Sequence, residues 1–243
     1  MHPVPMPHAG RFLLPALCAV IGFALGASIV GLGLVPTSWS AAIREALGRP
    51  AVEPWARERD ARIGQYRAFP VRSDVAMVGD SLTAFADWAS ILPDVRLANR
   101  GVNGDTTADT LSRLDTILSV RARIAFIQLG VNDIAAGRAV DAIEADYRRL
   151  VIALKDAGSR VVVLSTLECA RDRCGDRTAA TRALNGRLRG LARELQADWV
   201  DLNAILSAPG EGLRPQYTYD GVHLTAAGYA AWRDAIGPLL TAR

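Results

Sequence analysis

Histidine is scarce in this chain: only His2, His8 and His223 occur among its 243 residues. The first two precede a hydrophobic N-terminal segment, so a histidine that acts in the globular part of the chain must be His223. Cysteine is equally rare, and the two cysteines outside that segment cannot complete a four-ligand zinc site. The sequence therefore predicts no metal site, and it points to no cofactor.

Lysine occurs once, at Lys155, so the basic side chains are almost all arginines. These arginines are scattered among acidic residues without a basic cluster, and the net charge is only +3. A surface that binds nucleic acid usually carries such a cluster on one face. We therefore expect an ordinary solvated surface and no nucleic-acid partner.

Charge is absent from Phe12–Val35, a run about as long as a helix that spans a bilayer. Trp39, shortly after it, suits a membrane interface. The alternative is a secretory signal peptide cleaved near Ser38–Ser40, although the apolar region of such signals is usually about 7–15 residues. The length favours an uncleaved anchor that contacts the membrane through residues 12–35.

The orientation of this anchor rests on a weaker signal. Arg11 precedes the apolar run, but Arg44 and Arg49 follow it, so the positive-inside bias is small. A short tail inside and a large domain outside is the simpler topology. We expect an extracytoplasmic domain, either membrane-anchored or secreted after cleavage.

The chain divides into three predicted parts. Residues 1–39 form the tail and anchor or signal peptide, residues 40–71 a linker with a docking helix, and residues 72–243 a single domain of ordinary size. Pro70 ends the docking helix before the domain begins. The side chains available to dock are Trp55, Ile63 and Tyr66.

Strand-like and helix-like segments alternate through the domain. The predicted strands are Val75–Val78, Val95–Ala98, Ile124–Leu129, Val161–Leu164 and Trp199–Leu202. The predicted helices between and after them include residues 106–119, 140–154, 180–195 and 225–240. Such alternation predicts an α/β fold whose parallel sheet carries helices on both faces. We expect the flavodoxin-like strand order 2-1-3-4-5.

The first of these strands enters the turn Gly79-Asp80-Ser81-Leu82, which a helix-compatible segment follows. A serine at this place, beside the free backbone N–H groups of a helix start, could attack a carbonyl group. The structural alternative is that Ser81 only caps the helix, as serine often does. The four residues alone do not decide between these interpretations.

Three further polar segments fall at strand ends or before the last helix: Asn99–Asp105, Gly130–Asp133 and Asp220–His223. Because the carboxyl ends of parallel strands share one sheet edge, these segments should converge. Each has an ordinary alternative as a turn or a helix cap. Their joint occurrence favours a catalytic site.

The residue types in these segments complement Ser81. His223 is the available base, and Asp220, three residues earlier, could hold its second ring nitrogen. Gly104 permits close approach of a backbone N–H group, and Asn132 offers a side-chain amide donor. The pattern predicts a serine nucleophile with a base, an orienting acid and oxyanion donors.

These residues carry a family resemblance. The motifs are Gly79-Asp80-Ser81-Leu82, Asn99-Arg100-Gly101-Val102-Asn103-Gly104-Asp105-Thr106-Thr107, Gly130-Val131-Asn132-Asp133 and Asp220-Gly221-Val222-His223-Leu224. Together with Gly228-Tyr229 and Trp232, they resemble the SGNH hydrolases of the GDSL type. The closest likeness is to the platelet-activating-factor acetylhydrolase-like branch, and it covers roughly Arg72 to Leu240.

The resemblance implies a three-layer α/β/α fold and a metal-free serine hydrolase that acts on esters. It implies the nucleophile at Ser81, the base at His223 and the orienting acid at Asp220. It places the oxyanion hole at the backbone N–H groups of Ser81 and Gly104 and at the Asn132 amide. The Gly-x-Ser-x-Gly elbow of α/β-hydrolases is absent, as the resemblance requires.

We therefore expect an esterase that hydrolyses short-chain acyl or O-acetyl esters through an acyl-enzyme. The alternatives are a lysophospholipase or thioesterase for longer acyl chains, an acyltransferase to a glycan, and a non-catalytic binder of acylated glycans or lipids. The loops expected to shape the acyl pocket are Ile134–Ala139, Glu168–Thr178 and Asn203–Tyr219. Tyr217 and Tyr219 are candidates to line this pocket, with packing beneath it as the alternative.

Cys169 and Cys174 flank the segment Ala170–Arg173. Outside the cytosol such a pair could form a local disulfide, whereas in the cytosol free thiols are expected. A bridge that closes so small a loop would rigidify that loop more than it would stabilise the domain.

Overall fold

The computed structural model of the chain describes residues 54–175 and 177–241. The predicted tail and membrane span, including residues 12–35, lie outside the described residues. In the described part, no helix is both long enough and apolar enough to cross a membrane. The described residues belong to one compact unit, Pro54–Arg243.

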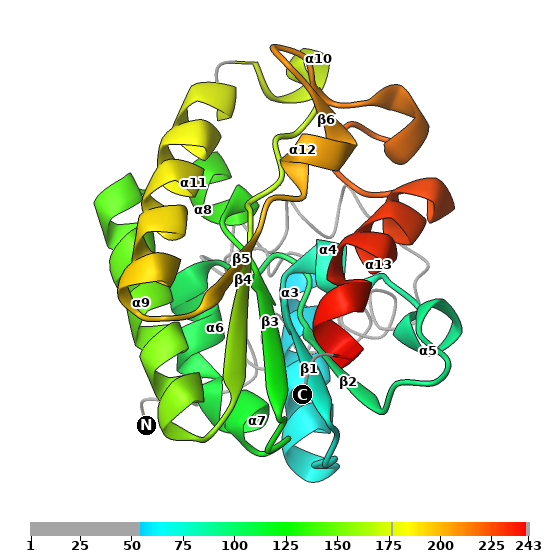
Figure 1. Cartoon of the computed structure of the whole chain (residues 1–243), viewed down its shortest axis with the longest axis vertical. Helices are drawn as coiled ribbons and strands as arrows, with labels where there is room; N and C mark the ends of the chain where they lie inside the picture. The colour runs from blue at the N-terminus through cyan, green and yellow to red at the C-terminus, as the bar shows by residue number, and fades with distance from the viewer. Residues whose placement is uncertain (1–53, 176, 242–243) are drawn as a thin grey trace, which may run out of the picture. The chain divides into compact units, whose positions relative to one another are not determined.

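The sheet has five parallel strands in the order β2-β1-β3-β4-β5, which confirms the predicted order (Figure 1). The strands are β1 (Val75–Gly79), β2 (Leu97–Gly101), β3 (Ile124–Gln128), β4 (Arg160–Leu164) and β5 (Asp198–Val200). Every residue of β1 and β3 is buried, because these inner strands are covered on both faces.

Helices cover both faces of this sheet, as the alternating pattern predicts (Figure 1). One face carries α6 (Thr107–Ser112), α7 (Leu114–Leu118), α9 (Val140–Asp156) and α11 (Arg177–Glu194). The other carries α4 (Ser81–Ala84), α5 (Trp88–Ile91), α12 (Asn203–Leu206) and α13 (Ala226–Thr241). Alternate side chains of β1 serve the two cores: Ala76 and Val78 join one, and Val75 and Met77 the other.

Strand β2 differs from the prediction, because it begins two residues later and includes Asn99 and Arg100. Their backbones continue the parallel ladder, with Asn99 opposite Met77 and Arg100 opposite Val78. The polar side chains concealed this strand in the sequence. Arg100 is accommodated because its Nε donates to the Thr116 carbonyl at 3.0 Å.

The helix predicted at residues 106–119 is broken at Arg113 into α6 and α7. A capping box is present at its start, where Thr106 and Asp109 exchange side-chain and backbone hydrogen bonds. The break has a polar cause. The fully buried guanidinium of Arg113 donates to Asp105 and to the Gly79 carbonyl.

The segment Asn203–Tyr219, predicted as a loop, contains structure of its own. After α12 comes a short antiparallel hairpin of β6 (Ser207–Ala208) and β7 (Gly212–Leu213), followed by a 3-10 turn at Pro215–Tyr217. Gly210 and Gly212 both take left-handed backbone angles, which glycine adopts without steric cost.

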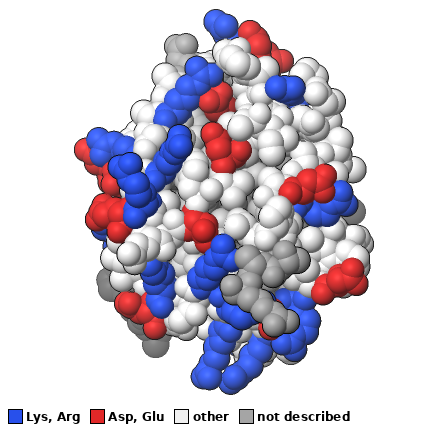
Figure 2. Space-filling model, in the orientation of Figure 1, with Lys and Arg blue, Asp and Glu red and all other residues white. Residues whose placement is uncertain are grey.

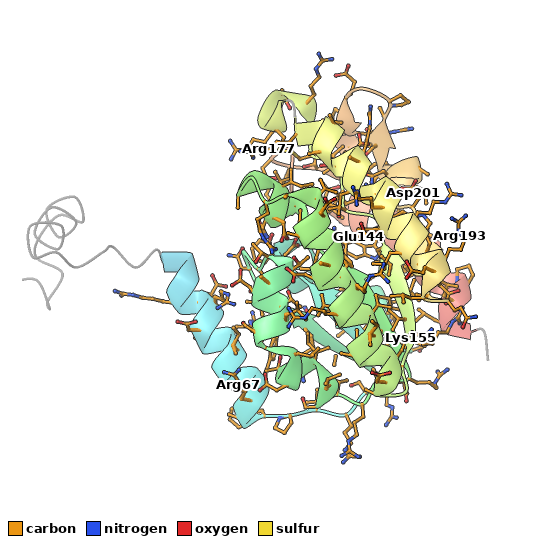
Figure 3. The ribbon with its side chains drawn as sticks, turned by 90° about the vertical axis from the view of Figure 1, so that its left-hand side faces the viewer. Arg67, Glu144, Lys155, Arg177, Arg193 and Asp201 are labelled. Carbon is orange, nitrogen blue, oxygen red and sulfur yellow. A yellow bond between two sulfur atoms is a disulfide. The ribbon has the colours of Figure 1, made fainter. Side chains whose placement is uncertain are left out.

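The surface carries charges of both signs. On the face drawn in Figure 2, acidic side chains lie among the basic ones, although Lys and Arg are more numerous at its lower end. Helices α9 and α11 lie side by side on the side of the molecule that faces the viewer in Figure 3, where Glu144 of α9 is labelled. Ion pairs of Arg187 with Glu144 and of Arg148 with Glu194 join the two helices.

Two glycines in regular structure have opposite surroundings. A Cβ atom at Gly101 in β2 would lie 2.3 Å from the Ala84 backbone nitrogen, whereas one at Gly190 in α11 would meet nothing within 4 Å. We predict that Gly101→Ala lowers the free energy of unfolding by about 2 kcal/mol or more through overpacking. Gly190→Ala should raise it by about 0.5–1 kcal/mol through helix propensity.

Urea unfolding of the wild type and the two variants, followed by circular dichroism, measures both changes. Equal stabilities for Gly101→Ala and the wild type would show that α4 can move away from β2 at no cost.

Candidate active site

The turn after β1 presents Ser81 as the first residue of α4. The helix cap is Asp80, whose carboxylate accepts a hydrogen bond from the Leu82 N–H at 3.0 Å. The Ser81 hydroxyl is therefore not consumed in capping. Its Oγ lies 3.0 Å from Nε2 of His223 instead. Of the two interpretations of Ser81 left open by the sequence, this geometry matches the nucleophile.

Asp220 and His223 lie in one turn before α13. The Nδ1 atom of His223 lies 2.7 Å from Oδ2 of Asp220. The other carboxylate oxygen of Asp220 accepts the backbone N–H groups of Val222 and His223 at 2.9 and 2.7 Å. The structure thus brings Ser81 into one hydrogen-bonded chain with Asp220 and with His223, which lies 142 residues after the serine.

The charge on Asp220 determines the tautomer of the histidine. Partial burial acts to raise the pKa of Asp220, but hydrogen bonds from the His223 ring and backbone outweigh it and lower this pKa to about 2. An ionised carboxylate only accepts hydrogen bonds, so the neutral imidazole carries its proton on Nδ1. Nε2 is then free to accept the proton of the Ser81 hydroxyl.

Two aromatic rings flank the His223 imidazole. The Phe85 ring lies 5.3 Å from it between centroids, and the Tyr219 ring stacks on it at 5.9 Å with 19° between the planes. Both are unusually open for aromatic residues, with 49% of Phe85 and 64% of Tyr219 exposed. Tyr219 is predicted at the site from the sequence, but Phe85 is not. Phe85 caps the C-terminal end of α4 four residues after Ser81, and this spacing places the two residues on one side of the helix.

Tyr217 lies elsewhere. It is partly buried and packs on the apolar cluster beneath α13, which also contains Trp232 and Leu224. Tyr217 therefore supports this cluster. Of the two tyrosines, only Tyr219 borders the turn Asp220–His223, which we call the acid–base turn.

The two predicted donor segments are linked to each other. Asn132 lies in α8 (Val131–Ala135), and its side-chain Nδ2 donates to the Asp105 carbonyl at 2.9 Å. This bond uses one of the two amide hydrogens and leaves the second for a ligand. Gly104, beside Asp105, has φ of 77°, a left-handed angle that glycine adopts without steric cost.

Buried carboxylates support these donor segments, and no role is predicted for them from the sequence. Asp105 accepts from Arg113 at 2.5 Å and from Arg59 at 2.8 Å. Burial raises the pKa of Asp105 although both arginines act to lower it. Asp133 accepts the backbone N–H and hydroxyl of Thr107 and is paired with Arg138. Both acids lie in the motifs quoted above, and this position is the one sequence feature that could have indicated their supporting role.

A disulfide-bonded loop packs on the acid–base turn. Cys169 and Cys174 are joined, with their Cα atoms 6.0 Å apart, and α10 (Arg171–Cys174) lies between them. The Ala170 N–H donates to the Gly221 carbonyl at 2.7 Å. A hollow of about 380 Å³ adjoins this contact, and its lining includes Arg173, Pro215, Tyr219 and Asp220.

Within residues 54–175 and 177–241, no group of three or more His, Cys, Asp or Glu side chains is placed so that it could hold a metal ion.

Comparison with known proteins gives a family match. Residues 77–231, more than half of the chain, match the model of the GDSL-like lipase/acylhydrolase family. An arylesterase of Vibrio mimicus is 31% identical over 103 residues, which cover 36% of this chain and 52% of that protein. The chain spans about half or less of the length of the curated relatives it matches.

Solved structures share the fold at lower identity. A protein named platelet activating factor from Streptococcus pneumonia has a TM-score of 0.72 at 21% identity, over 84% of this chain and 99% of its own. An acetylxylan esterase from Geobacillus stearothermophilus has a TM-score of 0.56 at 17% identity, over 72% of this chain and 98% of its own. At these identities the likeness shows the fold alone.

Asp80, the residue before Ser81, leads to a prediction about how the free energy of unfolding depends on pH. Burial, opposed by the Leu82 N–H but reinforced by Asp105 and Asp133, raises the pKa of Asp80 from 3.8 to about 7. Between about pH 4 and pH 7 the unfolded chain releases this proton while the folded chain retains it. Stability should therefore fall as the pH rises through this window, by several kcal/mol at about 1.4 kcal/mol per pH unit.

Asp80→Asn should remove this contribution, because the amide does not titrate and its oxygen can still accept the Leu82 N–H. Urea unfolding at intervals from pH 4.5 to 7.5 tests it. Asp87→Asn is the matched control: that exposed carboxylate has its pKa lowered by the Ser90 hydroxyl and should leave the slope above pH 5 unchanged. Parallel stability curves for Asp80→Asn and the wild type would contradict the prediction.

Proposed function

This chain belongs to the GDSL-like lipase/acylhydrolase family of SGNH hydrolases, and on that premise we propose that it is a serine esterase with an acyl-enzyme intermediate. The observation that carries the proposal is the hydrogen-bonded chain from Ser81 through His223 to Asp220. A weak nucleophile, a base with its acceptor nitrogen free and an ionised orienting acid are the parts that acyl transfer from an ester requires.

In the first step Ser81 Oγ bonds to the ester carbonyl carbon while its proton moves to Nε2 of His223. The resulting imidazolium is held by the Asp220 carboxylate on its other nitrogen. The tetrahedral intermediate then collapses, breaking the bond to the alcohol oxygen. That oxygen leaves with the proton from His223, and the acyl group remains on Ser81.

In the second step water attacks the acyl-enzyme. His223 takes a proton from the water as its oxygen bonds to the acyl carbon, and a second tetrahedral intermediate forms. Collapse of this intermediate breaks the bond to Ser81 Oγ, which recovers the proton. The products are the free carboxylic acid and the enzyme in its starting state.

The negative charge on the carbonyl oxygen needs donors that are fixed before the reaction. We assign this role to the backbone N–H groups of Ser81 and Gly104 and to the second hydrogen of the Asn132 amide. Ser81 begins a helix, where N–H groups lack partners within the helix. Asn132 is oriented by its bond to the Asp105 carbonyl, so little rearrangement is needed when the charge develops.

For the substrate we propose a short acyl group, such as acetyl, on an alcohol that contains a ring. The exposed faces of Phe85 and Tyr219 beside His223 offer stacking surfaces on the leaving-group side. The hollow that Tyr219 borders is lined in part by the charged Arg173 and Asp220, which suits a hydroxylated sugar better than a hydrocarbon chain. Acetylxylan esterase activity in a protein of the same fold agrees with this choice.

We further propose that the domain acts outside the cytosol, tethered through residues 12–35 or secreted. Support comes from the apolar run in the sequence and from the pairing of Cys169 with Cys174, because disulfides persist in oxidising compartments.

The assignment of the nucleophile predicts that Ser81→Ala loses hydrolysis of p-nitrophenyl acetate down to the uncatalysed background. It should also lose the covalent adduct that a fluorophosphonate probe forms with an activated serine. Ser112→Ala, at the end of α6, is the matched control and should keep both. Labelling is read by mass spectrometry of the intact chain and of its peptides.

Two results would count against the proposal. Ester hydrolysis by Ser81→Ala at the wild-type rate would place the nucleophile elsewhere. A wild type that folds but neither turns over esters nor takes the probe would favour the non-catalytic binder of acylated glycans or lipids.

The substrate proposal predicts a steep dependence on acyl chain length. For a protein of residues 51–243, kcat/KM for p-nitrophenyl esters should fall at least about tenfold from acetate to octanoate, since the charged Arg173 and Asp220 beside the site oppose burial of a hydrocarbon chain. Tyr219→Ala should raise KM for an acetylated xylo-oligosaccharide and change kcat little. Rising kcat/KM with chain length would favour a lysophospholipase or thioesterase, and acetyl transfer to an added glycan would favour an acyltransferase.

A further inference from the structure

Helix α3 (Pro54–Ala68) precedes the region matched by the family model, which begins at residue 77. It packs on the domain through Ile63 and Tyr66, which form a small buried cluster with Val102. The side chain of the third predicted docking residue, Trp55, lies outside what the structure describes. Val102 lies between β2 and the loop that carries Gly104. The helix therefore contacts the chain just before a proposed oxyanion donor.

Tyr66 holds the beginning of the segment Gly101–Asp105, which contains Gly104. Its hydroxyl donates to the Gly101 carbonyl at 2.9 Å, and the guanidinium of Arg100 lies 4.5 Å from the centre of its ring. Val102 in turn donates its N–H to the Gly79 carbonyl at 3.0 Å. The exit of β2 is thus held between α3 on one side and the end of β1 on the other.

Arg59 holds the other end of the segment. Its Nε donates to Oδ1 of Asp105 at 2.8 Å, and its Nη2 to Asp109 at 3.2 Å. The Asp105 carboxylate is fully buried, and Arg59 is only 17% exposed, so solvent screens this ion pair weakly. The same residue, Asp105, follows Gly104 and accepts the Asn132 amide on its carbonyl.

From these contacts we propose that Arg59 is a positioning residue for the oxyanion donors. By holding the Asp105 carboxylate from outside the family domain, Arg59 fixes the Gly104 N–H and, through the Asp105 carbonyl, the Asn132 amide. The inference rests on the proposed function, since it presupposes that these groups stabilise the oxyanion. Helix α3 would then position the oxyanion donors in addition to packing on the domain.

Arg67 supplies a matched control on the same helix. It lies about 12 Å further along the helix axis, at the end marked in Figure 3. There it pairs with Asp115 in an exposed bidentate contact. Removing Arg67 deletes its ion pair with Asp115, whereas removing Arg59 deletes those with Asp105 and Asp109. Only Arg59 reaches the loop that carries Gly104.

The test measures kcat and KM of the full chain for p-nitrophenyl acetate. Arg59→Gln should lower kcat about tenfold or more with KM changed little, because a misplaced donor acts on the transition state. Arg59→Lys should recover part of this loss, and Arg67→Gln should behave as the wild type. Thermal unfolding of each variant shows whether the loss of kcat merely follows a loss of folded protein.

A double-mutant cycle separates positioning from a structural role. Asn132→Ala should lower kcat about 100-fold, as loss of one oxyanion donor does. Adding Arg59→Gln to it should cost less than the product of the two single effects, since the part of the Arg59 effect that acts through Asn132 is already lost. Adding Arg67→Gln should change nothing further. Independent, multiplicative effects of Arg59→Gln and Asn132→Ala would overturn the inference.

Other outcomes are equally decisive. Full kcat in Arg59→Gln, with Ser81→Ala inactive, overturns the positioning role and leaves the proposed function intact. Full kcat in Asn132→Ala contradicts the oxyanion assignment itself. If Arg59→Gln does not fold, Tyr66→Phe, which keeps the ring but removes the bond to Gly101, should still lower kcat several-fold; unchanged kcat there overturns the inference.

Discussion

The contact on which the proposed site depends most is the buried ion pair between Arg113 and Asp105. Both side chains are fully buried, and Nε of Arg113 lies 2.5 Å from the carboxylate. A second guanidinium nitrogen donates to the Gly79 carbonyl at the end of β1. Removal of one partner of such a pair strands a buried charge and typically costs about 3–5 kcal/mol. Arg113 therefore contacts both the end of β1 and the loop that carries Gly104 and Asp105.

This arrangement explains why the nucleophile and the donors share one frame. Ser81 follows Gly79 by two residues, so the Arg113 guanidinium that fixes the Gly79 carbonyl also limits where α4 begins. Asp105, the other partner of Arg113, carries on its backbone the carbonyl that orients Asn132. Glycine at positions 79 and 101 lets α4 and β2 approach closely enough for these contacts, because a Cβ at either place would lie under 3 Å from neighbouring atoms.

The sequence predicts the frame of this fold well because apolar patterning reports burial. Strand β1 is apolar throughout, and β3 is apolar except for Gln128 at its end. The strand order and the helices on both faces follow from the alternation. The pattern fails where polar side chains are accommodated by hydrogen bonds to backbone carbonyls. Asn99 and Arg100 hide the extent of β2, and Arg113 hides the break between α6 and α7, since the carbonyls that accept from them, at Ala84, Thr116 and Gly79, leave no mark on the apolar pattern.

The proposed site was predictable as a set of residues but not as an arrangement. Short motifs at strand ends indicate Ser81, Asn132 and His223, since a parallel sheet gathers such ends at one edge. Their supports are not local in the sequence. Phe85 beside His223 and Arg59 on Asp105 depend on packing between segments, and no spacing rule connects residue 59 to residue 105.

The two halves of the site differ in how they are held. The donor half rests on buried arginine–carboxylate pairs, which solvent and salt screen weakly. The acid–base half is a partly exposed turn, held by short bonds within Asp220–His223 and by a contact from the disulfide-bonded loop at Gly221. Exposed backbone hydrogen bonds and sparse apolar packing are where local opening needs the least free energy. Access of an ester to Ser81 is then more readily adjusted at the turn, beside Tyr219, while the oxyanion donors stay fixed.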